Sequence, residues 1–297
     1  MDAVRGRGAL LWVALGASLW GTDTPLRRPL TESLSSSQIV FLEHLILTAA
    51  LAPALWLRRG EWRGLRRLEW AAILGLAWGG SALATLCFTE AIKIGNPTTA
   101  VLLQKMQPLF AGLLARALLG EALGRRFWIC LALAAAAGYV ISFGDQLGAV
   151  SLAEARAEAA LLALAAAGLW GASTVLGRFA LGRLPFFTLT ALRLVAATPF
   201  LAALAVLGPG PVVARIDAGQ FLTLLLMALV PGLAALLVYY RGLRDAPASR
   251  AAIAELAYPA TATLLNWAVL GARLTAAQAG GFAVLWGVIL GIEKKPP

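Results

Sequence analysis

The chain has 297 residues, of which 60% are hydrophobic and only 13% are charged. A soluble domain is nearer half apolar and one quarter charged, so this composition excludes an ordinary globular protein and indicates an integral membrane protein. The formal net charge is +10. The basic residues lie mainly in short loops between apolar runs, a pattern that sets membrane topology and argues against a nucleic-acid partner. Cys87 and Cys130 each lie inside an apolar run without metal-binding or redox spacing, so we interpret them as core residues and expect no metal site.

A membrane-spanning helix needs roughly 17 to 25 mostly apolar residues. Ten runs meet this requirement, and the first of them extends into Asp23 and Pro25. All ten are expected to be helices, because lipid satisfies no backbone hydrogen bonds and the alternation of barrel strands is absent. No cleaved signal peptide is expected. The predicted spans, in chain order, are 8–27, 38–57, 69–92, 97–118, 126–144, 157–178, 185–207, 218–240, 247–270 and 275–292.

The distribution of Lys and Arg predicts the orientation of these spans. If the N-terminus is cytoplasmic, seventeen basic residues fall on the inner side and six on the outer side, and two lie within spans. Basic loops are retained in the cytoplasm, so both termini are predicted to be cytoplasmic in a multi-pass protein of the bacterial inner membrane. The inner loop 58–67, which carries five arginines, is expected to meet anionic lipid headgroups.

The sequence contains an internal duplication. Leu19-Trp20-Gly21 returns as Leu169-Trp170-Gly171 after 150 residues, and Gln104 and Pro108 return as Glu255 and Pro259 after 151. Five spans per copy is an odd number, so the second copy enters the membrane from the opposite face. We therefore predict two inverted five-helix repeats, residues 1–147 and 148–297, which together form one transport domain. Paired repeats of this kind offer two packings around a shared site, which is typical of a transporter.

Several of these motifs resemble the drug/metabolite transporter superfamily, specifically its EamA-type members. The resemblance rests on Leu-Trp-Gly in the first helix of each unit and on the stretches 100–110 and 251–259, with Leu119-Gly120-Glu121 after the first stretch. It implies an all-α membrane fold of ten helices in two inverted repeats, with no cofactor and no enzymatic activity. Within the family, exporters of aromatic and other neutral amino acids are the most similar.

The chain departs from the family pattern in two places. The family often has an Arg in the second helix of each unit; Arg193 fits, but its counterpart is Glu43, followed by His44. The Gly-Glu after the fourth helix becomes Gly-Ala-Arg at 271–273 in the second copy. A site with symmetric chemistry is therefore not expected.

The fourth and ninth spans each present a polar face at helical spacing. These faces consist of Gln104, Gln107, Pro108 and Ala111 in the first half, and of Glu255, Tyr258, Pro259 and Ala262 in the second. Each proline removes a backbone donor and frees a carbonyl one turn earlier, near the depth where alternating-access proteins place their substrate. Two interpretations remain open: these faces line a substrate cavity, or the prolines are structural kinks with interhelical hydrogen bonds.

Lys105, Glu43 and His44 are charged or titratable residues inside predicted spans, where such groups are costly and usually functional. Lys105 is expected to pair with Glu43 or Glu255, or to attract a substrate carboxylate. Glu43 and His44 either relay a proton or form a fixed structural contact with Arg193.

Aromatic residues are further candidates for the cavity. Trp20 and Trp170 are repeat partners beside glycines, where each provides a flat apolar wall with one donor for a substrate, or packs in the core between the repeats. Trp78 and Tyr239 are candidates of the same type.

These features together predict a secondary transporter that exports small amphipathic metabolites, with amino acids as the favoured class, by alternating access. The alternatives are a carrier of another small polar solute or drug, and a channel or structural membrane protein. No nucleotide-binding motif is present, so a substrate or proton gradient would supply the energy. A single His without a paired acidic motif argues against an intramembrane enzyme. A small molecule, the lipid bilayer and protons are the expected partners, and a monomer is favoured.

Overall fold

The computed structural model describes residues 8–95, 97–143, 156–207, 215–270 and 275–293, and the regular elements in these ranges are helices. Six helical stretches in the described chain are long and apolar enough to cross a membrane, and a shorter apolar helix covers Ala276–Ile292. The six are Ser36–Leu57, Arg67–Ala91, Arg125–Phe143, Ala157–Ala180, Phe186–Leu207 and Ala218–Leu243. The all-α membrane class predicted from composition is confirmed.

The helices follow the predicted spans to within a few residues, with one exception described below. Their bounds in the first half are α2 (Ala9–Trp20), α3 (Asp23–Leu30), α4 (Ser36–Leu57), α5 (Arg59–Trp62), α6 (Arg67–Leu74), η1 (Gly75–Leu83), α7 (Ala84–Ile94), α8 (Pro97–Gln104), α9 (Gln107–Leu119) and α10 (Arg125–Phe143). In the second half they are α11 (Ala157–Ala180), α12 (Phe186–Leu207), α13 (Ala218–Met227), η4 (Ala228–Ala234), α14 (Ala235–Leu243), α15 (Ala248–Ala254), η5 (Glu255–Ala257), α16 (Tyr258–Leu270) and α17 (Ala276–Glu293).

The first predicted span, 8–27, is wrong at its end. Helix α2 stops at Trp20, and a separate short helix, α3, begins at Asp23. The 12 residues of α2 extend only about 18 Å, less than the roughly 30 Å hydrocarbon core. Asp23 and Pro25 lie in the first turn of α3, where an acidic side chain suits the helix dipole and a missing backbone donor costs little. These residues therefore favour a new helix over the continuation of α2.

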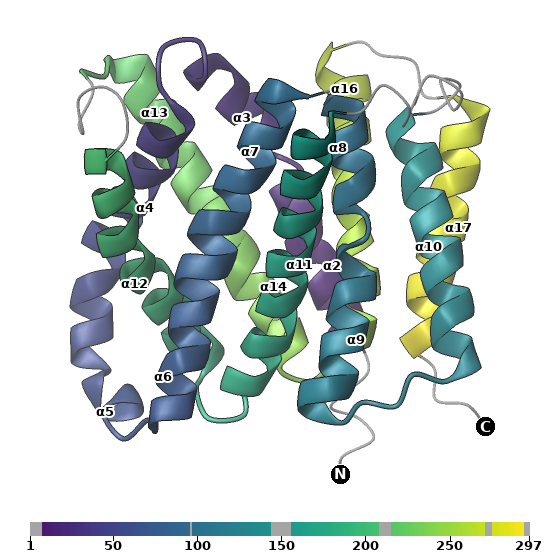
Figure 1. Cartoon of the computed structure of the whole chain (residues 1–297), viewed down its shortest axis with the longest axis horizontal. Coiled ribbons are helices and arrows are strands. Elements are labelled where there is room, and N and C mark those ends of the chain that lie inside the picture. Colours follow the sequence, from purple (N-terminus) through teal and green to yellow (C-terminus); the bar gives the residue numbers. More distant parts are fainter. Residues whose placement is uncertain (1–7, 96, 144–155, 208–214, 271–274, 294–297) are drawn as a thin grey trace.

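The two halves pack as an inverted repeat. Helix α2 of the first half runs along α14 of the second, and α11 of the second half runs along α7 and η1 of the first. The equivalent helices α4 and α12 pack against each other, as do α10 and α17, which lie side by side at one edge of the bundle (Figure 1). Thr48 and Thr198, which are 150 positions apart, share a hydrogen bond of 2.7 Å between their hydroxyls. This pairing of equivalent positions agrees with the predicted duplication.

Helices from the two halves come close together where glycine replaces a side chain. A Cβ on Gly16 of α2 would lie 2.6 Å from the Tyr239 backbone nitrogen, and one on Gly242 of α14 would lie 2.5 Å from the Ala9 carbonyl oxygen. Small residues allow such contact in membranes, where dispersion and hydrogen bonds rather than exclusion of water hold helices together. The largest buried cluster accordingly includes Val13 of α2 and Leu243 of α14, so both halves share one core.

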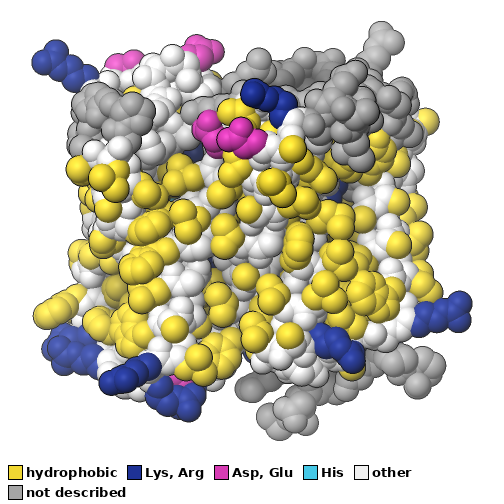
Figure 2. Space-filling view, in the orientation of Figure 1, with side chains coloured by type: hydrophobic (Ala, Val, Ile, Leu, Met, Phe, Trp, Pro, Cys, Tyr) yellow, Lys and Arg dark blue, Asp and Glu magenta, His cyan; other side chains and the backbone are white. Residues whose placement is uncertain are grey.

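Charged side chains gather at the two ends of the bundle. Figure 2 shows a broad hydrophobic band between an upper and a lower edge, with several Lys and Arg side chains along the lower edge. Exposed residues such as Leu57, Leu118 and Leu161 contribute to the apolar outer surface. The described part of the chain begins and ends at this same lower side (Figure 1).

Candidate functional site

The centre of the candidate site is the buried carboxylate of Glu255, at the interruption between α15 and α16. Its Oε1 accepts hydrogen bonds from the Tyr239 hydroxyl at 2.7 Å and the Thr174 hydroxyl at 2.8 Å. Its Oε2 accepts a hydrogen bond from the amide nitrogen of Gln107. These donors come from α14, α11 and α9, so residues far apart in sequence converge here. Among the described residues, no cation forms a salt bridge with Glu255.

Prolines explain why two helices are interrupted at this depth. A proline ring clashes with the carbonyl four residues earlier, and for Pro108 and Pro259 those positions are Gln104 and Glu255. Helix α8 ends at Gln104 and α9 begins at Gln107, while α15 gives way to a short 3-10 turn at Glu255. Gln104 also donates a hydrogen bond of 3.2 Å to Gln107. The amides and the carboxylate thus form a polar chain that joins the interrupted helices of the two halves.

Two tryptophans at repeat-equivalent positions border this polar chain. The Trp20 ring lies 5.0 Å from the Tyr239 ring, measured between centroids. Trp170 lies one turn before Thr174, packs edge-on against Phe88 at 5.4 Å and donates from Nε1 to the Gly80 carbonyl at 3.1 Å. Both tryptophans are partly exposed. They therefore place aromatic surface beside Tyr239 and Thr174, two of the donors to Glu255.

The remaining predicted site residues are distributed unevenly around this centre. Tyr258 is the first residue of α16 and is half-buried. Trp78 lies apart from the Glu255 group, because it stacks on Phe200 and donates to the Ala196 carbonyl at 3.0 Å. Lys105 is buried and points toward α10, where its Nζ lies 3.7 Å from the place of a Cβ on Gly138.

The expected ion pairs of Lys105 and Arg193 are not present among the described residues. Lys105 forms no salt bridge there with Glu43 or Glu255. The expected contact of Glu43 with Arg193 is also absent; instead, the Arg193 Nε donates to the Ser81 hydroxyl at 2.8 Å and its Nη1 donates to the Tyr240 hydroxyl at 2.7 Å. Both expectations came from opposite charges in apolar spans, and a sequence does not show which helices become neighbours.

Glu43 has a different partner, Arg27 of α3, one of the six basic residues predicted to lie on the outer side. The Arg27 guanidinium lies 3.3 Å from Glu43 Oε2 and 2.7 Å from Asp23 Oδ2. Burial by itself would lower the pKa of Arg27, but the carboxylates of Asp23 and Glu43 raise it above the ordinary value of an arginine. The spacing of Asp23 and Arg27, four residues apart on a helix, is the one sequence signal for this group.

His44 lies beside Glu43 in the chain but faces another group. Its Nδ1 lies 2.9 Å from the Val40 carbonyl, and its Nε2 is buried without a hydrogen-bond partner in the described structure. A proton relay between Glu43 and His44 therefore stays a prediction.

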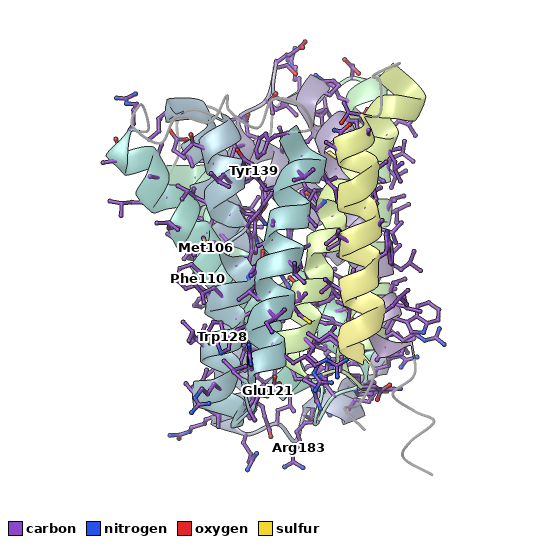
Figure 3. The ribbon with its side chains drawn as sticks, turned by 90° about the vertical axis from the view of Figure 1, so that its right-hand side faces the viewer. Met106, Phe110, Glu121, Trp128, Tyr139 and Arg183 are labelled. Atoms are coloured by element: carbon purple, nitrogen blue, oxygen red, sulfur yellow. The ribbon has the colours of Figure 1, made fainter. Side chains whose placement is uncertain are left out.

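Glu121, part of the Leu-Gly-Glu motif, connects the two halves at the end of the bundle. Its carboxylate accepts hydrogen bonds from the Ala248 and Ser249 backbone nitrogens at 2.7 and 3.0 Å, and from the Ser249 hydroxyl. A carboxylate in this place caps the N-terminus of α15 and suits its dipole. Figure 3 shows Glu121 and Arg183 at the same lower end of the molecule. The corresponding residues 271–273 lie outside the described residues.

Comparison with known proteins assigns the family. The model of the EamA-like transporter family matches the chain twice, at residues 7–143 and 157–292. The chain belongs to the EamA-like transporter family. It is therefore a multi-pass membrane transporter of the drug/metabolite transporter superfamily, and not an enzyme.

Two curated relatives cover nearly the whole chain. The riboflavin transporter ImpX of Fusobacterium nucleatum is 31% identical over 296 residues, which is 97% of this chain and 98% of ImpX. The uncharacterized transporter YwfM of Bacillus subtilis is 25% identical and covers 99% of this chain and 96% of its own length. A solved crystal structure shares the fold, with a TM-score of 0.77 over 95% of both chains at 22% identity.

Proposed function

We propose that this transporter exports small amphipathic metabolites, with amino acids as the favoured substrates, across the bacterial inner membrane by alternating access. The observation that carries the proposal is the buried Glu255 carboxylate, which has three neutral donors and, among the described residues, no salt bridge, since Arg193 acts on it only at longer range. A buried charge is costly unless it is compensated, and an ammonium group on the substrate would compensate it. The neighbouring Trp20 and Tyr239 rings offer an apolar wall for the rest of the molecule.

The architecture supports alternating access around this carboxylate. Inverted-repeat transporters bind their substrates at interrupted helices near the middle of the membrane. Here the interruptions after Gln104 and at Glu255 occur in equivalent helices of the two halves, and the Gln107 side chain connects them. Rocking one half against the other would open this junction to either side. Both termini would then lie in the cytoplasm, as the distribution of basic residues predicts.

Uptake of labelled neutral amino acids into proteoliposomes tests the proposal. A carrier should show saturable uptake that accelerates when unlabelled substrate is present on the far side. For Glu255→Gln we expect amino-acid uptake to fall by at least about 10-fold, since a charge-assisted hydrogen bond contributes roughly 1.5 to 3 kcal/mol. The matched control is Glu158→Gln, which changes an exposed carboxylate on α11 and should leave uptake unchanged.

Three results would contradict the proposal. Uptake that never saturates would indicate a channel. No uptake across a broad amino-acid panel would exclude this substrate class, and equal uptake by the wild type and by well-folded Glu255→Gln would remove the proposed role of Glu255.

Riboflavin is a second candidate substrate, supported by the 31% identity with ImpX over almost the full chain. The aromatic surface of Trp20, Trp170 and Tyr239 would also suit a flat ring system. Riboflavin carries no ammonium group, so Glu255→Gln should affect its uptake much less than that of an amino acid. The same proteoliposomes, loaded with riboflavin, therefore separate the two candidates.

A further inference from the structure

Arg193 of α12 is another buried charge in the core, and its hydrogen-bond partners are neutral. It is 8% exposed and donates to the hydroxyls of Ser81 and Tyr240. Its Nη2 takes part in neither hydrogen bond, and within the described ranges no carboxylate forms a salt bridge with it. Burying a guanidinium is costly unless an anion lies close by. The Glu255 carboxylate acts on Arg193 only at longer range, so an anion bound directly to the guanidinium would stabilise this arrangement.

An unsatisfied donor lies beside Arg193. Ser173 of α11 is 6% exposed, and its hydroxyl is buried without a hydrogen-bond partner in the part of the chain that the structure describes. Gly80 of η1 is the point where the two donors meet: a Cβ there would lie 3.2 Å from Arg193 Nη2 and 1.8 Å from Ser173 Oγ. Glycine thus allows a guanidinium and a free hydroxyl to converge in one small space.

Two pairs of consecutive residues connect this space to the Glu255 group. Thr174 and Tyr239 donate to the Glu255 carboxylate, whereas their chain neighbours Ser173 and Tyr240 belong to the Arg193 group. The rings of Tyr239 and Tyr240 lie 5.4 Å apart between centroids. An acidic group and a basic group, each without an opposite charge bonded to it, are therefore adjacent across the same two helices, α11 and α14.

We propose that Arg193 and Ser173 bind the carboxylate of an amino-acid substrate while its ammonium group lies at Glu255. The inference rests on the proposed function, and it defines the substrate class as zwitterions whose ammonium and carboxylate groups are bonded to the same carbon. A guanidinium presents two parallel donors that match the two oxygens of a carboxylate, and the Ser173 hydroxyl supplies a third donor. The site selects an amino acid over its amide, because an amide leaves the Arg193 charge uncompensated.

Competition for labelled phenylalanine uptake into proteoliposomes tests this inference. The competitors are phenylalanine, which has both charges, and phenylalaninamide, which keeps the ammonium group but has no carboxylate. The wild type should prefer phenylalanine by at least about 10-fold. In Arg193→Gln the half-saturating concentration of phenylalanine should rise by about 10-fold or more, while that of the amide should stay within about 2-fold, so the preference disappears. Arg125→Gln, an exposed position at the start of α10, is the control and should behave as the wild type.

A second variant keeps the test decisive if Arg193→Gln does not fold. Ser173→Ala removes a hydroxyl that has no partner among the described residues, so it should fold normally. It should raise the half-saturating concentration of phenylalanine by about 3- to 10-fold and leave that of the amide unchanged. Folding of every variant is checked by its melting temperature in detergent.

The outcomes separate this inference from the proposed function. If the wild type transports phenylalanine but Arg193→Gln and Ser173→Ala both keep its preference over the amide, only the carboxylate site is overturned. If Lys105→Met abolishes the preference while Arg193→Gln does not, the carboxylate binds at Lys105 and the inference is likewise overturned. A wild type that transports no amino acid overturns both proposals.

Discussion

The contact between Arg27 and Glu43 shows how a single buried charge depends on its partner. Glu43 is 7% exposed on α4, and its Oε1 lies close to Gly232 of η4, where a Cβ would be 3.2 Å away. Its Oε2 lies 3.3 Å from Arg27. The short helix α3 thus connects to the core through one guanidinium, and α3 also packs against α13 of the second half. The contact therefore helps to hold the two halves together on the upper side.

Removing Arg27 should destabilise the transporter more than removing an exposed arginine. In Arg27→Met we expect a loss of about 3 to 5 kcal/mol, because the Glu43 carboxylate stays buried without its cation. The melting temperature in detergent reports this loss. The control is Arg215→Met, an exposed position.

The double variant Arg27→Met with Glu43→Gln should recover much of the lost stability, since no uncompensated charge remains. A single variant as stable as the wild type would show that the contact contributes nothing.

At the scale of the helices, the close packing of α2 against α14 depends on glycines at their contact. Tyr239 of α14 donates a hydrogen bond to Glu255. Its backbone packs against Gly16 and its ring packs against Trp20, both on helix α2. Any shift of α2 away from α14 therefore moves the aromatic wall relative to the carboxylate. Stability and transport are therefore coupled at the contact between α2 and α14.

A methyl group at Gly16 should separate the two helices. The Cβ of Gly16→Ala would lie 2.6 Å from the Tyr239 backbone nitrogen, and backbone atoms on a packed helix cannot move aside cheaply. We expect a loss of about 1 to 3 kcal/mol, seen as a lower melting temperature, together with reduced uptake.

Gly168→Ala provides the matched control on α11, because nothing lies within 4 Å of its added Cβ. It should be neutral or slightly stabilising, since alanine is the better helix former. Equal melting temperatures for the two variants would contradict the close packing of α2 and α14.

Another feature at this scale is the widened turn in the third helical stretch of each half. The π-helical segments η1 and η4 carry Gly80 and Gly232, which lie against Arg193 and Glu43. Arg193 and Glu43 are themselves repeat equivalents, 150 positions apart. In each half, a glycine of the π-helical segment thus lies close to the charged side chain of a neighbouring helix. That side chain is basic in one case and acidic in the other. Single-turn π-helices occur mostly at functional sites, which agrees with this location.

For the whole molecule, the predicted inverted repeat determines which loops lie on the same side of the membrane. The described chain starts and ends on the same side, where α5 also lies (Figure 1). Helices α5 and α3 lie on opposite sides of the bundle (Figure 1); Gly60 in α5 and Glu32 directly after α3 are both exposed. Cysteine labelling at these two positions therefore reports the orientation directly.

We expect Gly60→Cys to react only with a reagent that reaches the cytoplasm, and Glu32→Cys to react with an impermeant reagent added outside. Cys87 and Cys130 are first replaced by Ala, and labelling is compared between intact and opened cells. Reaction of both positions from the same side would contradict the predicted arrangement, and reversed labelling would overturn the cytoplasmic termini.

Some of this organisation is determined by the sequence alone. Apolar run length predicts the helices because lipid leaves the backbone no other partner, and the odd number of spans per copy predicts the inverted repeat. Pro108 and Pro259 indicate where two helices are interrupted, since the ring clash is local to the chain. Helical spacing predicted Gln104 and Gln107 on one polar face and Glu255 on the corresponding face of the second half, and the structure brings the three together.

Only the tertiary structure decides which buried groups become partners. Arg27 is chemically an ordinary loop arginine in the sequence, and its contact with Glu43 depends on how α3 folds back over α4. The place of Arg193 beside Gly80 and Ser173 depends likewise on three helices that cross from different halves. Side-chain contacts between helices depend on crossing angle and register, which arise from packing over the whole bundle. No periodic pattern in the sequence predicts them.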